Sequence, residues 1–348
     1  MGVYLENQHA YLMDILQVAK RANVSTATVS RVINGLPGVR EKTSARVRQA
    51  IAEMNYVPNT NARNLRVGRT RLFGLIVSDV NNPFFPELID AFEALASADG
   101  IEVIFTHTNY DPKRLQSCVR RMIERNVDAI AVMTSEVEEE SLQQAVRQGV
   151  PVVLMNQRKL AGKYPNVLVE YAAGFREALE HLLSLGHCDI GFIAGPQSLN
   201  SARGRKDAFT AALREHGLHV RAEWIAIGDM RVEGGRMAME KLLSCTPRPT
   251  AVITSNDLMA VGALQAAHAA KIRVPKDLSI IGFDDIPIAA MVHPALSTIR
   301  HPRREVAARA FDCLRQILLG KEVVAGAPLQ PHLVVRHSTA PPAGDKGR

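Results

Sequence analysis

The segment from Asp14 to Gly35 constrains this chain more than any other, because it contains two short helical patterns separated by a tight turn. Val18, Ala19, Val29 and Val32 recur at spacings that bring them together where two helices cross. Ala19 is small enough to allow the two backbones a close approach. The pattern therefore predicts a pair of short helices that share one apolar face.

The residues at the turn and on the outer face indicate what such a pair could bind. Asn23 lies at the turn, where a residue that tolerates positive φ is needed, and Ser25 is a good N-cap for the second helix. Once the valines are buried, the second helix keeps these residues on its outer face: Thr26, Ala27, Ser30, Arg31 and Asn34. We interpret the segment as a helix-turn-helix, whose second helix can enter a DNA major groove. A helical hairpin with no role in DNA binding has the same apolar spacing and is the alternative.

Positive charge is concentrated in the same part of the chain. Residues 1–71 contain 11 lysines and arginines against 4 aspartates and glutamates, which accounts for the whole formal net charge of +7. The residues that follow hold 31 of each sign and balance. A module that binds phosphates needs such an excess, whereas a solvated basic surface would not have to coincide with the motif. The charge distribution therefore favours the DNA-binding interpretation.

Several classes of protein are disfavoured by what the sequence lacks. Four widely spaced cysteines fit neither a metal site nor a disulfide-rich scaffold: Cys118, Cys188, Cys245 and Cys313. No apolar run approaches the length of a membrane span, and the N-terminus lacks the pattern of a signal peptide. No glycine-rich dinucleotide fingerprint or nucleophile–base set is evident. We therefore expect a cytoplasmic protein that is not an enzyme and has no metal, no cofactor and no membrane partner.

Two further segments follow the helix-turn-helix. Glu41–Asn55 places Val47, Ala50 and Ile51 on one face, so it predicts a third helix that completes a small core. Asn59–Arg66 could form a helix of about two turns, which is marginal in water without a partner. A polar linker is the alternative for this second segment.

From Leu72 onward the pattern changes to strands that alternate with helices. The predicted strands are 72–77, 102–106, 129–133, 152–155, 189–193, 251–254 and 278–283. The predicted helices are 85–98, 114–125, 173–185, 205–216, 232–243, 257–270 and 303–319. Such alternation predicts parallel sheets covered by helices, and the length of this region suits two α/β lobes better than one.

A set of segments occurs in collinear order from about Asp14 to Val335. In the N-terminal part they are VAKRANVSTATVSRVING, TSARVRQAIAEMNYVPN and ARNL. In the rest of the chain they are NNPFF, DAIAV, GHCDIGFIAGP, RPTAVITSNDLMAVGAL, VPKDLSIIGFDDI and HPALSTI. Together they closely resemble the lactose/galactose-repressor family of bacterial transcription regulators. The resemblance implies an all-α helix-turn-helix headpiece, a hinge helix and a two-lobed α/β effector domain like that of periplasmic sugar-binding proteins.

This organisation divides the chain into five expected parts. Residues 1–13 are a tail or a misassigned start, 14–57 form the DNA-binding domain, and 58–71 form the hinge helix and linker. Residues 72–337 form the two-lobed effector-binding and dimerisation domain, and 338–348 form a polar tail. No heptad pattern of the kind that assembles tetramers follows Val335, so we expect a homodimer.

The resemblance assigns roles on the second helix. Thr26, Ala27 and Arg31 occupy the positions that read bases in the family. Arg31 is the best candidate for a bidentate contact to guanine, whereas Ala27 can offer only a methyl group. Short polar side chains are expected to bind phosphates instead: Thr28, Ser30 and Asn34.

The resemblance also gives the segment Asn59–Arg66 a role that favours a hinge helix over a polar linker. Leu65 matches the family's leucine that wedges into the minor groove at the operator centre. Ala62 lies on the same side of this segment, and Arg66 follows directly after Leu65. We expect these three residues to contact the minor groove.

Polar residues at the ends of predicted strands indicate a ligand pocket. They follow the carboxyl ends of four strands: Asn82, Asn156, Asn256 and Asp284. Ligands bind outside these ends in open parallel sheets, so two facing lobes would enclose a cleft there. Further residues complete the candidate effector-binding set, and the resemblance points to the same positions: Phe84, Phe85, Ser201 and Arg205.

Each of these candidates has a purely structural alternative. An asparagine at a strand end often forms a turn or caps a helix, which applies to Asn82 and Asn156. Phe84 and Phe85 could be ordinary core residues.

The same residues suggest a ligand class. A carboxylate, a guanidinium and an aromatic face suit a polyhydroxylated ring, because Asp284 and Arg205 can hold hydroxyl groups while an aromatic ring covers the C–H side. Met230 and Leu199 stand where purine-binding members of the family resemble one another in having an aromatic residue and an arginine. We therefore expect a sugar or sugar derivative as effector. The alternative is a nucleobase or nucleoside that acts as a corepressor.

Taken together, the sequence predicts a ligand-responsive transcription regulator, a repressor that binds a pseudo-palindromic operator as a homodimer. Its expected partners are double-stranded operator DNA and a small-molecule effector. A cytosolic sugar-binding protein is the alternative from another class, and it would leave the basic headpiece without a role.

Overall fold

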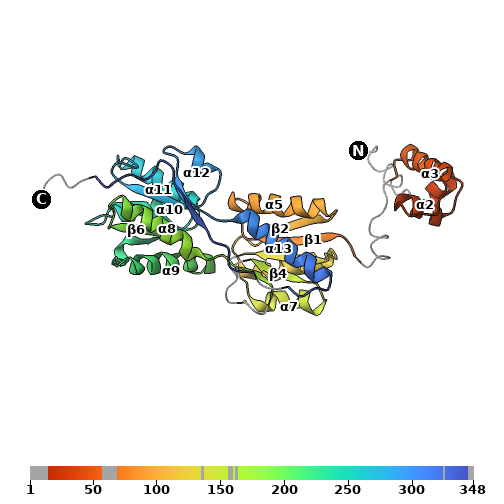
Figure 1. Ribbon diagram of the computed structural model, residues 1–348, viewed down its shortest axis with the longest axis horizontal. Helices are drawn as coiled ribbons and strands as arrows, with labels where there is room; N and C mark the ends of the chain where they lie inside the picture. Colours follow the sequence, from red (N-terminus) through yellow and green to blue (C-terminus); the bar gives the residue numbers. More distant parts are fainter. Residues whose placement is uncertain are drawn as a thin grey trace, which may run out of the picture. The chain divides into compact units, whose positions relative to one another are not determined.

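The computed structural model describes residues 15–56, 69–134, 137–155, 160, 164–323 and 326–343. The chain divides into a headpiece that ends at Thr70 and a larger unit that begins at Arg71 (Figure 1). Within the described residues, no helix is long and apolar enough to cross a membrane.

The headpiece is built from three helices, α1 (Ile15–Arg21), α2 (Thr26–Ile33) and α3 (Glu41–Glu53). Its core consists of small and branched apolar side chains from all three helices, closed by one tyrosine: Val18, Ala19, Ala22, Val29, Val47, Ala50 and Tyr56. Asn23 adopts a φ of 48° at the turn, and the Ser25 hydroxyl accepts a hydrogen bond from the Thr28 amide at 3.2 Å. The predicted helix-turn-helix with a third supporting helix is therefore confirmed.

The larger unit begins with an α/β lobe, the N-terminal lobe, whose five strands pair in parallel in the order β2-β1-β3-β4-β5. The strands are β1 (Leu72–Val77), β2 (Glu102–His107), β3 (Ala129–Met133), β4 (Val152–Met155) and β5 (Asn166–Val167). Helices α5 (Phe84–Ala98) and α13 (Arg303–Leu318) pack together on one face. Helices α6 (Pro112–Glu124) and α7 (Glu139–Arg147) cover the other. Alternate β1 residues face the two layers, which is the two-residue period of a strand buried on both sides.

The second lobe, the C-terminal lobe, contains a six-stranded sheet in the order β11-β10-β9-β8-β6-β7. Its strands are β6 (Ile190–Ala194), β7 (Ile225–Ile227), β8 (Ala251–Thr254), β9 (Ser279–Asp284), β10 (Ser297–Arg300) and β11 (His332–Val334), of which only β11 pairs antiparallel. Helices α8 (Tyr171–Ser184) and α9 (Asn200–Glu215) cover one face. Helices α10 (Val232–Leu243) and α11 (Asp257–Ala269) cover the other. A short 3₁₀ helix (Ala222–Trp224) and α12 (Ile288–Met291) complete the lobe.

The chain passes between the lobes after β5, after β10 and again between α13 and β11. Helix α13, drawn in blue, therefore lies among elements that come early in the sequence (Figure 1). Val169 and Leu329, from two of the crossing segments, form an isolated parallel bridge. The α/β fold in two lobes with parallel sheets is confirmed, and every predicted strand and helix of this region is present with ends shifted by at most a few residues.

The structure differs from the sequence expectations in several short elements and at the end of the chain. Strands β5, β7, β10 and β11 and helices α7 and α12 were not predicted. Strands β5, β7 and β11 have only two or three residues, too few for a two-residue alternation to be recognised. Residues 338–340, expected to begin a polar tail, pack into the lobe instead. The Ser338 hydroxyl is buried, donates to the Ile280 carbonyl and accepts from the Ser297 amide.

The closest packing between helices is at the crossing of α10 and α11. A Cβ added at Gly262 would overlap the backbone of Val232 and Arg236 on α10. Added at Gly235, it would overlap the backbone of Met259 on α11. The two helices can approach this closely only because each has a glycine, without a side chain, where it meets the backbone of the other.

We predict that Gly262→Ala lowers the free energy of unfolding by about 1–3 kcal/mol, because rigid backbone on α10 must move. Gly204→Ala is the matched control on helix α9, where the added Cβ would lie 3.5 Å from the Tyr171 ring, an ordinary contact. This control should leave stability unchanged or raise it by about 1 kcal/mol, since alanine favours helix over glycine. Urea denaturation of both variants tests the packing, and equal stabilities would contradict it.

Candidate nucleic-acid interface and effector pocket

The outward side of α2 carries the residues expected to read DNA. Val29 is buried against the headpiece core, while Ala27 and Arg31 are exposed and Thr26 is partly exposed. The structure thus places the three expected base-reading side chains on the open surface of one helix. Arg31 also supplies a cation in the last turn of α2.

The residues expected to bind phosphates lie on the same helix but already have partners within it. The Thr28 and Ser25 hydroxyls are 3.0 Å apart, and the Asn34 amide donates to the Ser30 carbonyl at 2.7 Å. These bonds fix the side-chain orientations at both ends of α2, and each hydroxyl retains capacity for a phosphate oxygen. The expected hinge residues, Ala62, Leu65 and Arg66, lie outside the described residues.

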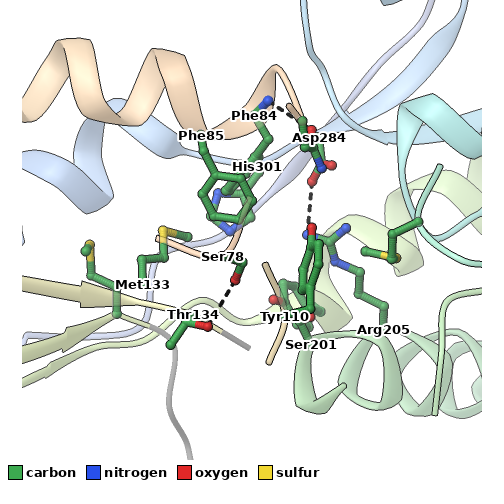
Figure 2. A pocket seen from close by; sticks show the side chains of 14 residues that line it. Ser78, Phe84, Phe85, Tyr110, Met133, Thr134, Ser201, Arg205, Asp284 and His301 are labelled. Carbon is green, nitrogen blue, oxygen red and sulfur yellow. Dashed lines mark hydrogen bonds and ion pairs between the residues drawn. The ribbon is translucent and has the colours of Figure 1, made fainter. Parts of the chain in front are cut away.

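A pocket in the larger unit lies at the carboxyl ends of strands from both lobes (Figure 2). Ser78 follows β1 and Thr134 follows β3, both in the N-terminal lobe. Asp284 ends β9, and His301 follows β10. Ser201 and Arg205 reach the pocket from the first turns of α9. The predicted location of the pocket, at the strand ends between two lobes, matches this arrangement.

The most polar feature of the pocket is an ion pair between Arg205 and Asp284. The Arg205 Nη2 lies 2.9 Å from the Asp284 Oδ1, and the two residues are only 5% and 2% exposed. The guanidinium also donates to the Ser255 carbonyl and lies 4.0 Å from the centroid of the Phe283 ring. Burial raises the pKa of the Asp284 carboxyl, against the opposing influence of the Arg205 and Arg303 cations. The pair adds no net charge to the pocket.

Asn82 has the structural role considered for it and also lines the pocket. Its Oδ1 accepts a hydrogen bond from the Phe84 amide at 3.0 Å, so it caps the start of α5 while lining the pocket. Its side chain also hydrogen-bonds the Tyr110 hydroxyl, whose pKa is raised because the group is buried. Tyr110 therefore presents a protonated hydroxyl at this wall.

Aromatic rings and thioethers form the apolar walls. Phe84 and Phe85 meet edge to face with ring centroids 5.0 Å apart, and Phe84 meets His301 at 4.9 Å and 85°. Three sulfur-containing side chains also line the pocket: Met133, Met155 and Met230. The two phenylalanines are thus both core residues and pocket walls.

His301 is the most unusual side chain of the pocket. It is 2% exposed, and burial together with the cations Arg205 and Arg303 holds its pKa well below the ordinary value of 6.5. Its Nδ1 has no hydrogen-bond partner among the described residues. His301 therefore offers a neutral imidazole nitrogen that a ligand can satisfy.

Three other residues considered at this site are placed elsewhere or not described. Asn256 is not on the pocket wall, because its Oδ1 caps α11 through the Met259 amide at 2.9 Å and its Nδ2 donates to the Met230 carbonyl at 2.8 Å. Leu199 is buried in the C-terminal lobe rather than lining the pocket. Asn156 lies outside the described residues.

Several wall residues were not selected from the sequence, although some could have been. Ser78 and Thr134 each follow a predicted strand directly, so the strand-end argument that selected Asn82 and Asp284 applied to them too, whereas His301 follows β10, which was not predicted. Tyr110 comes from the loop between β2 and α6 and Tyr171 is the first residue of α8, and nothing in their local sequence indicates that they turn toward the pocket.

A helix-turn-helix with an exposed recognition face, joined to two lobes that enclose a small-molecule pocket, defines an effector-binding transcription regulator. Residues 14–59 match the family of bacterial regulatory proteins named lacI, and residues 179–339 match the periplasmic binding protein-like domain. The HTH-type transcriptional repressor PurR of Proteus mirabilis is 37% identical over 330 residues, 94% of this chain and 96% of that protein. PurR of Serratia proteamaculans is 38% identical over 331 residues, again 94% of this chain and 96% of that protein. The chain belongs to the lacI family.

Solved structures agree with this assignment. The lac repressor dimer bound to operator and the anti-inducer ONPF is 27% identical, with a TM-score of 0.86 over 94% of this chain and 99% of that one. The transcriptional regulator CelR in complex with cellobiose is 28% identical, with a TM-score of 0.68 over 93% of this chain and 99% of that one. As a member of this family, the chain is a cytoplasmic DNA-binding transcriptional repressor and not an enzyme.

We predict that His301 makes the protein less stable as the pH falls below about 6.5. Its pKa in the folded protein is lowered, so below the unfolded value the unfolded chain takes up a proton that the folded protein does not. The free energy of unfolding should therefore fall by up to about 1.4 kcal/mol per pH unit through this residue.

His301→Gln should reduce the loss of stability between about pH 7.5 and about pH 5, as measured by urea denaturation. His219→Gln, which changes a solvent-exposed histidine, is the control and should behave like the wild type. Nearby carboxylates titrate in both proteins and cancel in the comparison. The same pH dependence in His301→Gln and the wild type would contradict the neutral, buried assignment.

Proposed function

We propose that this repressor acts as a homodimer on a pseudo-palindromic operator and that its effector is a nucleobase or nucleoside acting as a corepressor. The observation that carries the effector proposal is the pocket itself, in which aromatic rings and thioethers surround one polar, charge-neutral edge. A flat heteroaromatic ring fits between such walls, and its N–H and C=O groups can face the polar edge.

The polar edge can satisfy a nucleobase without adding charge. The Asp284 carboxylate accepts hydrogen bonds, and Arg205 retains a buried Nε that has no partner among the described residues. His301 adds a second unpartnered buried nitrogen. Nucleobases carry donors and acceptors side by side on one edge, which is the combination that these groups require.

Similarity to known proteins supports the same effector class. The relatives named PurR are 35–38% identical over nearly the whole chain. The sugar-bound structures are less similar, at 28% for CelR with cellobiose and 27% for an Enterococcus faecium regulator with ribose.

A sugar remains the second candidate because of Met230. This side chain lines the pocket at the position where purine-binding members of the family resemble one another in having an aromatic ring. The ion pair of Arg205 and Asp284 can hold vicinal hydroxyl groups as readily as a nucleobase edge.

The proposed mechanism is a shift between two arrangements of the lobes. Pocket groups come from both lobes, so a ligand that binds them together favours one arrangement over the other. In the proposed dimer, this arrangement sets how close the two segments 58–71 lie and thus whether they fold as hinge helices on DNA. The lac repressor dimer bound to operator, with its TM-score of 0.86, supports a dimer here.

We predict that Arg31→Ala lowers affinity for the cognate operator at least about tenfold and weakens the preference for it over a scrambled site. Lys20→Ala removes the same charge from an exposed position on α1 and should weaken binding to both sites equally. Fluorescence anisotropy at several salt concentrations measures both effects, and wild-type affinity should fall steeply with salt. An unchanged preference in Arg31→Ala would place the reading surface elsewhere.

We predict that guanine or hypoxanthine raises the thermal midpoint of the protein and its operator affinity, whereas ribose and cellobiose do not. Arg205→Lys keeps the charge but loses the planar fork, so it should weaken binding of the active compound by about tenfold to a hundredfold. Lys206→Ala, at a residue that does not line the pocket, is the control on the same helix. A response to the sugars alone would favour the second candidate, and a normal response in Arg205→Lys would place the pocket elsewhere.

A further inference from the structure

Arg303 contacts both lobes behind the wall of the pocket. It is the first residue of α13, in the N-terminal lobe, and it is 5% exposed. Its guanidinium donates to the carbonyls of Asp284, the last residue of β9, and Asp285, the residue after it; the Asp285 contact is 2.9 Å. On the other side, its Nε and Nη2 lie 3.1 and 2.5 Å from the Glu87 Oε2.

In the C-terminal lobe, Arg303 holds a strained bend. Asp284 has a φ of 114° and Asp285 a φ of 57°, and such values are unfavourable for residues with a side chain. The bend persists because its groups are bound from several sides. The Ile286 amide donates to Asp257 at 2.8 Å, and Arg336 holds the Asp285 carboxylate at 2.6 Å. The bend also sets the direction of the Asp284 carboxylate, which pairs with Arg205 in the pocket.

In the N-terminal lobe, Arg303 is held at the helix that supplies the aromatic wall. Glu87 lies in the first turn of α5, two residues after Phe85. The Arg303 guanidinium lies 5.6 Å from the centroid of the Phe84 ring. One buried cation is therefore bound to the start of α5 and to the bend that carries Asp284.

We propose that Arg303 is a positioning residue that couples the effector pocket to the placement of the two lobes. Glu87 orients the guanidinium, and the guanidinium holds the bend across the lobe boundary. A ligand that draws on Asp284 therefore acts on α5 through Arg303. This inference rests on the proposed function, because it assigns a transmission role to a residue beside the same pocket.

A buried cation needs its partners to stay in place. The coupling through Arg303 can therefore be tested by changing Glu87, its partner in the N-terminal lobe. Glu87→Gln removes the negative charge that pairs with Arg303 and leaves the guanidinium with neutral acceptors only, the glutamine amide oxygen and the two backbone carbonyls. The variant changes the N-terminal lobe, while the expected effect is in the C-terminal lobe. A local ion pair without a coupling role would show no such effect.

The experiment is amide hydrogen exchange of the ligand-free, full-length protein, followed on the segment that contains the Asp285 and Ile286 amides. Glu87→Gln should speed this exchange at least about fivefold. Glu93→Gln removes the same charge from an exposed position on α5 and should leave the exchange unchanged. Equal exchange in Glu87→Gln and Glu93→Gln would overturn the proposal.

A second pair of variants decides the question if Glu87→Gln does not fold. Arg303→Lys keeps the charge but lacks the planar fork that spans these acceptors, so it should also speed the exchange. Arg304→Lys is its control, because Arg304 is 76% exposed and lies 3.5 Å from Glu87. Unchanged exchange in Arg303→Lys would overturn the proposal.

Operator affinity, measured with and without guanine, tests whether this coupling affects DNA binding. In Glu87→Gln the factor by which guanine changes operator affinity should fall at least about fivefold, while Glu93→Gln keeps the wild-type factor. A full guanine response in Glu87→Gln would overturn the coupling. If guanine has no effect on the wild type, the nucleobase proposal fails, and the exchange measurement in the ligand-free protein still decides the role of Arg303.

Discussion

The buried ion pair between Arg205 and Asp284 is the interaction on which the pocket depends. Taking two charges out of water is costly, and the structure offsets the cost by placing a carbonyl and an aromatic face against the guanidinium. Burial also disfavours the charged forms of two other groups nearby. Burial and the charge of Asp284 raise the pKa of the Asp257 carboxyl well above its usual range, and burial lowers that of His301. Arg205 and Asp284 thus form one neutral pair in the pocket, with the ion pair of Arg303 and Glu87 behind its wall.

That electrostatic arrangement limits what the pocket can accept. A charged ligand would add an unpaired charge where little water remains to stabilise it, whereas a neutral ligand need only exchange hydrogen bonds. The Arg205 Nε and His301 Nδ1, which have no partner among the described residues, need hydrogen bonds from a ligand. The thioether and aromatic walls favour contact with a flat apolar ring. A neutral heteroaromatic ring meets these conditions, whereas a sugar has more hydroxyl groups that would need partners against the apolar walls. The nucleobase proposal is preferred for this reason.

The strand pattern predicted both lobes, because strands buried on two sides read as long apolar runs between helical segments. The strand-end argument also located Asn82 and Asp284 at one pocket. It could not separate Asn82 from Asn256, since both follow strands and cap helices, and only tertiary packing directs one toward the ligand. Tyr110 could not be predicted either, because tertiary packing places its ring. Its loop begins in one lobe, and the ring packs against the core of the other.

The segments that connect the lobes also supply pocket residues. His301 lies on the passage after β10 and Tyr171 follows the passage after β5, while Arg303 stands at the end of the first of these. Any change in the angle between the lobes must alter the backbone of these short passages, and with it the position of the side chains that meet the ligand. Binding and lobe placement therefore cannot vary independently, and these crossing segments, with Arg303 at the end of one of them, connect the effector to the lobes.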